Sequence, residues 1–232
     1  MQDATPIREF VTDFDLVTIV LRLDSLNAAE LEELDIQFKP AEIEAIEEEL
    51  DETIQVTQSI GSIGPSVNVT IPSRQMDMAI APQRIEVRSQ KPEFSKDTAE
   101  AMVRLMRIGL GKYGSPDCQS IGHNYLASRR TSDGTAIQQI QKKLMKEGLN
   151  LRSGNHRLLG GSCSLWFEVE DSILLLKTEP SRASKTTSRY QINANFSVEL
   201  GDEGEIPESD GFVERLLLYC RRFETIVDGL GL

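Results

Sequence analysis

The amino-acid sequence predicts an α+β protein in which antiparallel sheets are covered by amphipathic helices. Several segments alternate apolar and polar residues with the period of two that is typical of strands with one buried face. Strands and helices do not alternate regularly along the chain, which disfavours a parallel sheet. Two longer segments, 95–109 and 210–229, have the amphipathic pattern of helices that bury one face.

We divide the chain into an N-terminal half, residues 1–130, and a C-terminal half, residues 131–232, and leave open whether they form one domain. The first strand is expected in FDLVTIVLRLDS at 14–25, because its residues alternate and many are β-branched. An acidic helix is expected over 40–52, starting at Pro40, a residue favoured at the first helical position. The other elements expected in this half are strands in TIQVTQSIG and PSVNVTIPS, a hairpin over 76–90, a helix over 95–109 capped by Ser95, and a strand over 118–129.

The C-terminal half begins with a helix predicted over 133–147, and residues 149–162 are expected to form a loop because they are rich in turn formers. A hairpin over 162–179, a strand over 189–200 and a helix over 210–229 complete this half. Each half therefore has a hairpin, a strand with an asparagine beside an aromatic residue, and a long amphipathic helix. This pattern favours a pseudo-duplication of two similar halves, although their identity is slight and chance patterning is the alternative.

Charge is unevenly distributed along this acidic chain, whose net charge is −12. Residues 1–60 hold 3 Lys/Arg and 16 Asp/Glu, whereas residues 129–189 hold 11 and 6. Both ends of the sequence are acidic and the middle is mildly basic. Such asymmetry can steer a charged partner or pair one copy of the chain with another.

The sequence also indicates in which cellular compartment the protein is expected. No apolar run is long enough to cross a bilayer, and the N-terminus has neither the basic start nor the apolar core of a secretory signal. Three widely spaced cysteines fit reduced thiols better than a disulfide framework. We therefore expect a cytoplasmic protein with no membrane partner.

The stretch GLGKYGS at 109–115 contains a G-x-G-x-x-G pattern with glycines at 109, 111 and 114. A dinucleotide-binding fingerprint follows a strand and opens a helix, so that the helix N-terminal amides face the pyrophosphate. Here the glycines follow the helix predicted at 95–109 and precede a strand. The pattern therefore predicts a helix stop with a left-handed cap, followed by Pro116, and no bound phosphate.

No motif points to a cofactor or a metal, since the sequence has no C-x-x-C, H-E-x-x-H or H-x-E pattern. GGSCS at 160–164 resembles an oxyanion-hole loop, but the G-x-S-x-G elbow is absent and a turn into a strand is the simpler interpretation. The candidates for catalysis are His123 and Tyr125, which share a face of the strand over 118–129. A histidine in a strand is more often a structural residue.

We favour a non-enzymatic protein-interaction or assembly component that associates with itself or with another protein. The apolar runs LLL at 174–176 and LLLY at 216–219 exceed what one buried face needs, and mark either an interface or a doubly covered core. Two alternatives stay open, an unrecognised enzyme centred on His123 and a protein that binds nucleic acid non-specifically, with Tyr125 and Tyr190 stacking on bases. The basic surface for nucleic acid would comprise Arg129, Arg130, Lys142, Lys143, Arg152, Arg157, Arg182 and Lys185.

Overall fold

The computed structural model describes residues 12–24, 34–61, 64–113, 117–131, 136–144, 152–153, 156–157, 162–170, 172–180, 189–200 and 206–230. These residues form an α+β structure with an antiparallel sheet, which confirms the predicted combination of helices with antiparallel strands. The strands are β1 (Leu16–Leu23), β2 (Gln55–Gly61), β3 (Gly64–Ile71), β4 (Met76–Ala81), β5 (Arg84–Ser89), β6 (Cys118–Arg130), β7 (Arg152–Ser153), β8 (His156–Arg157), β9 (Cys163–Val169), β10 (Ser172–Pro180) and β11 (Arg189–Glu199). The helices are α2 (Pro40–Leu50), α3 (Lys96–Gly111), α4 (Ala136–Leu144) and α5 (Ser209–Gly229), with a 3₁₀ turn η1 (Pro72–Arg74).

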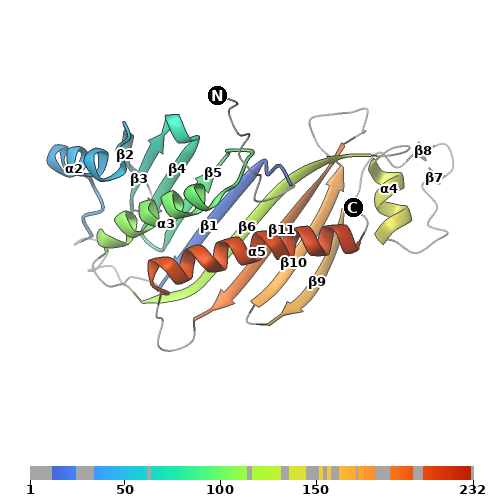
Figure 1. The fold of residues 1–232 in the computed structure, drawn as a ribbon. Helices are drawn as coiled ribbons and strands as arrows, with labels where there is room; N and C mark the ends of the chain where they lie inside the picture. Colours follow the sequence, from blue (N-terminus) through green and yellow to red (C-terminus); the bar gives the residue numbers. More distant parts are fainter. Residues whose placement is uncertain are drawn as a thin grey trace, which may run out of the picture.

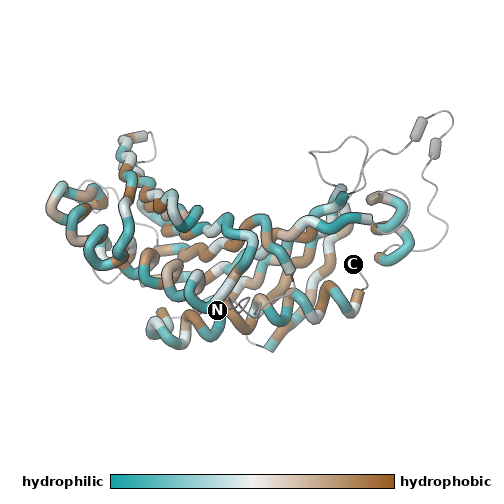
Figure 2. Tube along the Cα trace, turned by 45° about the horizontal axis from the view of Figure 1, so that its top comes forward, coloured by the Kyte–Doolittle hydropathy of each residue, from teal (hydrophilic) through white to brown (hydrophobic). Residues whose placement is uncertain are grey.

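Both halves of the chain contribute to one nine-stranded sheet, in the order β2-β3-β4-β5-β1-β6-β11-β10-β9 (Figure 1). Strands β1 and β6 lie at the centre of the sheet and pair antiparallel, with Ile19 opposite His123. Every other pairing in this sheet is also antiparallel. Teal and brown alternate along the strands in Figure 2, as expected for strands whose successive residues face opposite sides.

The long helices α3 and α5 lie on one face of the sheet (Figure 1), hereafter the helix face. Its strand residues and the inner sides of the two helices are buried as one apolar core. Tyr125 of β6 donates from its hydroxyl to the carbonyl of Leu216 in α5, at 2.8 Å. The opposite face, hereafter the open face, is mostly polar and includes Thr18, which lies opposite Arg88 on β5 and Asn124 on β6.

The glycine motif does not end α3 in the predicted way. The helix continues to Gly111, and its C-cap residue Lys112 has a right-handed backbone conformation, so the expected left-handed cap is wrong. Gly109 lies inside the helix, where a Cβ atom would come within 2.8 Å of Met78 Sδ and 3.2 Å of Ile85 Cγ2. Glycine therefore fits closely here, because α3 lies near the sheet and a larger residue would displace these side chains.

Two other expectations also change. The predicted loop 149–162 contains the short strands β7 and β8, which pair with each other. The apolar runs are mainly core: Leu174, Leu176 and Leu216 are buried, while Leu218 is 40% exposed. None of the helices described in the structure is long and apolar enough to span a bilayer.

Candidate interaction surfaces

The predicted catalytic residues His123 and Tyr125 lie on the helix face beneath α5, and both side chains are fully buried. The imidazole of His123 packs against the rings of Phe212 and Tyr219, with centroids 5.7 and 4.9 Å away. Neither ring nitrogen has a hydrogen-bond partner among the described residues. Burial, helped by the charge of Arg215, lowers the pKa of His123 to about 3. A substrate would not reach this neutral imidazole while α5 stays in place.

On the open face, the strands bring together two asparagines that the sequence had placed in different halves. Asn195 Nδ2 on β11 donates to Asn124 Oδ1 on β6, at 2.6 Å. This bond satisfies one donor and one acceptor across the sheet, so the pair supports strand pairing. It presents no activated group for catalysis.

A charged cluster occupies the open face of β4 and β5. Glu86 accepts hydrogen bonds from Arg84 and from Arg88 Nε, the latter at 2.5 Å, and Arg88 also lies 3.6 Å from Asp77. Burial raises the pKa of Glu86, but the hydrogen bond from Arg88 and the charges of both arginines outweigh it and lower the pKa overall. Burial raises the pKa of Asp77 despite the charge of Arg88. These opposite charges neutralise one another, so the cluster is a structural network.

The basic residues expected to bind nucleic acid lie partly together. The end of β6 and α4 lie at one end of the molecule (Figure 1). This end carries Arg129 and Arg130 on β6 and exposed Lys142 and Lys143 on α4. Arg152 and Arg157 are register partners in the separate two-stranded sheet. Arg182 and Lys185 lie outside the described residues.

Two features of this basic end affect whether it could bind nucleic acid. Arg130 is exposed and lies directly opposite Arg189, an unfavourable like-charge pair across two strands. Arg129 is only partly exposed and donates to Thr12 Oγ1 at 2.9 Å. Tyr125 and Tyr190 are buried, so neither ring is available for the base stacking considered above.

The edge strand β9 has an exposed apolar surface that the sequence analysis missed. Trp166 is 70% exposed on the open face, directly opposite half-exposed Leu175 on β10. Ile173, also on that face of β10, is 55% exposed. On the helix face, Leu165 and Phe167 of β9 are only half-buried. The strand thus has incompletely covered apolar residues on both faces.

A signal for Trp166 was present in the sequence. Along β9 it falls in the same phase as the polar Ser164 and Glu168, while Cys163, Leu165 and Phe167 occupy the other phase. An aromatic residue in the polar phase of an amphipathic strand indicates a surface with a use beyond the core. Cys163, in the apolar phase, is half-buried and has a free thiol.

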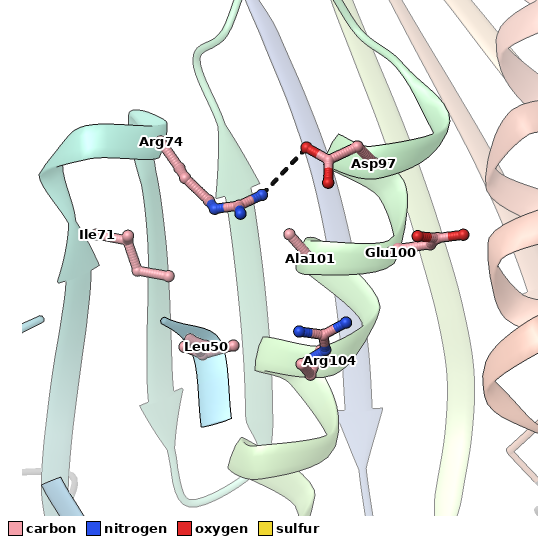
Figure 3. A pocket seen from close by; sticks show the side chains of 7 residues that line it. All are labelled: Leu50, Ile71, Arg74, Asp97, Glu100, Ala101 and Arg104. Carbon is pink, nitrogen blue, oxygen red and sulfur yellow. Dashed lines mark hydrogen bonds and ion pairs between the residues drawn. The ribbon is translucent and has the colours of Figure 1, made fainter. Parts of the chain in front are cut away.

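Two hollows lie on the helices. The first is a pocket of about 30 Å³ between α2, η1 and α3 (Figure 3), enough for a water molecule. Arg74 joins its sides, with Nη1 3.1 Å from Asp97 and Nε 2.6 Å from Glu52. The second is a shallow hollow of about 560 Å³ beside α5, bounded by Glu170 in the β9–β10 turn and by Leu217 and Leu218.

Neither the chemistry of the described residues nor the comparisons with known proteins assign an activity. Among the residues that the structure describes, no three His, Cys, Asp or Glu side chains converge as a metal site. No protein-family model matches the chain, and no sequence among the curated proteins matches it significantly. The exposed edge at β9 is the feature that best fits a binding function.

Proposed function

We propose that this chain is a non-enzymatic protein-interaction and assembly component that uses the β9 edge to bind a protein strand. One observation carries the proposal: β9 ends the nine-stranded sheet, with Trp166 exposed on the open face and Leu165 and Phe167 only half-buried on the helix face. The unpaired backbone groups of an edge strand can pair with another chain, and adjacent apolar side chains give that pairing affinity.

We also propose that the chain arose by pseudo-duplication and that α3 and α5 are equivalent helices covering corresponding parts of the sheet. The sheet order supports this, because β1, β5, β4 and β3 on one side mirror β6, β11, β10 and β9 on the other. In this proposal the second repeat begins with β6, and not at residue 131 as in the division made from the sequence. The equivalent of β9 is then β3, and β3 has β2 as its outer neighbour. Among the described residues, β9 has no such neighbour. A partner strand would take the position that β2 holds in the first half.

The energetics favour pairing at this edge. An aromatic side chain can bury about 150–250 Å². Covering the exposed 70% of Trp166 is therefore worth roughly 3–4 kcal/mol before the cost of association is subtracted. Ile173 and the half-buried side chains of Leu165 and Phe167 add to this gain.

The first test is sedimentation velocity over a range of protein concentrations, with the substitution Trp166→Ser. We expect the wild-type protein to associate and the variant to sediment as a smaller species. Ile60→Ser is the matched control, because Ile60 is a 79% exposed apolar residue on the opposite edge strand, β2. Equal association of wild type and Trp166→Ser, or a wild type that is monomeric throughout, would count against self-association at β9.

Trp166 is the only tryptophan in the chain, so its fluorescence is a direct second readout. On association, its emission should shift to shorter wavelength and iodide quenching should decrease. An emission spectrum and a quenching constant that do not change with concentration would show that no partner covers this residue under those conditions.

A second candidate function is binding of nucleic acid at the basic end, favoured by the Arg130–Arg189 pair. Two like charges directly opposite on neighbouring strands destabilise a sheet unless an anion lies between or near them. If this surface binds nucleic acid, a labelled oligonucleotide should bind at low salt and dissociate as salt rises. The double substitution Arg130→Ala with Arg189→Ala should abolish this binding, while Lys91→Ala, at an exposed lysine elsewhere, should not. No binding at low salt would eliminate the candidate.

A further inference from the structure

We infer that the strand added at β9 comes from a second copy of this chain, paired antiparallel about a two-fold axis that passes beside Trp166. This inference rests on the proposed function, because it names the partner of the same edge. Trp166 is the middle residue of β9, which runs from Cys163 to Val169. A two-fold axis at that position aligns the two strands over their full length. Such an isologous contact is the commonest way in which identical chains pair.

The sequence of β9 is complementary to itself in this register. Trp166 lies opposite the partner's Trp166, and Ser164 lies opposite the partner's Glu168, so no like charges face each other. Side chains directly opposite in an antiparallel pair share a face, so the two tryptophans meet on the open face. There they continue the exposed apolar surface of Ile173 and Leu175.

Other registers lose this match. A shift by two residues in either direction places Trp166 opposite the partner's Ser164 or Glu168 and separates the aromatic pair. A shift by one residue places Trp166 opposite Leu165 or Phe167, so that open-face residues of one copy lie opposite helix-face residues of the other. The register centred on Trp166 is therefore the one in which both faces match.

The helix face supports the same arrangement. In the centred register, Leu165 lies opposite the partner's Phe167, and Cys163 lies opposite the partner's Val169. These side chains are half-buried in the single chain, and the hollow beside α5 with its exposed Leu218 lies close to the β9–β10 turn. A two-fold axis perpendicular to the sheet puts both copies of α5 on the same side. The two sets of half-buried residues then complete one apolar layer between the helices.

The native Cys163 allows a test of both partner and register. In the centred register, a cysteine at position 169 faces Cys163 of the partner subunit, within the Cα separation that a disulfide tolerates. We expect Val169→Cys, oxidised by glutathione disulfide, to give a covalent dimer that reductant reverses. The control Phe167→Cys faces the partner's Leu165 and should give at least about tenfold less dimer. A further control, Val169→Cys with Cys163→Ser, should give none.

Each other outcome overturns part of the inference. A covalent dimer from Phe167→Cys but not from Val169→Cys would place the second copy in a shifted register. No covalent dimer from either variant, with association that still requires Trp166, would leave β9 as an interface of another geometry. Monomers at all concentrations would remove the second copy as partner. Association that persists unchanged in Trp166→Ser would place the assembly contact away from β9, and the proposed function would then fail together with this inference.

Discussion

His123 should make this protein sensitive to mild acid. Its imidazole is fully buried between Phe212, Tyr219 and the sheet, and neither nitrogen has a hydrogen-bond partner among the described residues. Burial lowers the pKa of His123 from 6.5 to about 3 in the folded protein. The folded state therefore keeps this imidazole neutral at pH values at which the unfolded chain protonates it.

The sign and the size follow from linkage. Because the folded pKa is depressed, the unfolded state binds more protons below pH 6.5, so acid favours unfolding. The contribution of His123 to stability is fully present above pH 6.5 and is lost as the pH falls toward 3. With these two pKa values, about 2 kcal/mol is lost between pH 7 and pH 5, and about 4 kcal/mol by pH 3.

The assay is urea unfolding at pH 7 and pH 5 of the wild type and of His123→Leu. The leucine removes two unsatisfied buried nitrogens and some aromatic contact, so its stability at pH 7 should be within about 1 kcal/mol of wild type. Between pH 7 and pH 5 the variant should lose about 2 kcal/mol less than wild type. His156→Ala, which changes the only other histidine, should behave like wild type. If His123→Leu loses as much stability as wild type, His123 is not a buried neutral imidazole in solution.

Three further substitutions test how the helices contact the sheet. Gly109→Ala should lower the free energy of unfolding by about 1–2 kcal/mol, measured by urea titration, because its Cβ would lie 2.8 Å from Met78 Sδ. Gly111→Ala, where a Cβ would have no neighbour within 4 Å, should instead raise stability by up to about 1 kcal/mol, and similar effects at the two sites would contradict the packing argument. Tyr125→Phe should cost about 1–2 kcal/mol, since it removes the hydrogen bond to the Leu216 carbonyl inside the core, and an unchanged midpoint would mean that this bond contributes nothing.

The fold class could be predicted because it depends on local periodicity. Strands with one face against helices keep a period of two, and β6 and β11 show it clearly. Ser95 is the N-cap of α3 and accepts a hydrogen bond from the backbone N–H of Thr98. The start of this helix could therefore also be predicted from the local sequence. These features involve residues only a few positions apart.

What the sequence did not reveal depends on residues far apart in the chain. The sequence predicted that Gly109 ends a helix. In the structure its role is to leave room for Met78 and Ile85 of β4 and β5, and the local sequence does not show that these strands contact the helix. The alternation around His123 showed that it shares a face with Tyr125, but not that α5, about ninety residues later, closes over that face. A sequence motif can be recognised without knowledge of the strand order, whereas the burial of a histidine cannot be predicted without it.

The two edges of the sheet also explain why assembly should stop at two copies. Four of the seven residues of β2 are Gln, Thr or Ser, and Gln58 exchanges two hydrogen bonds of 3.1 Å with the backbone of Phe38. The edge strand β9 has Leu165, Trp166 and Phe167 in its centre instead. If both edges were equally apolar, each copy could bind two neighbours and the contact would propagate into a fibre. Pairing about a two-fold axis through β9 uses the same surface on both copies. The closed dimer then leaves the two β2 edges, on which Ile60 is the exposed large apolar residue.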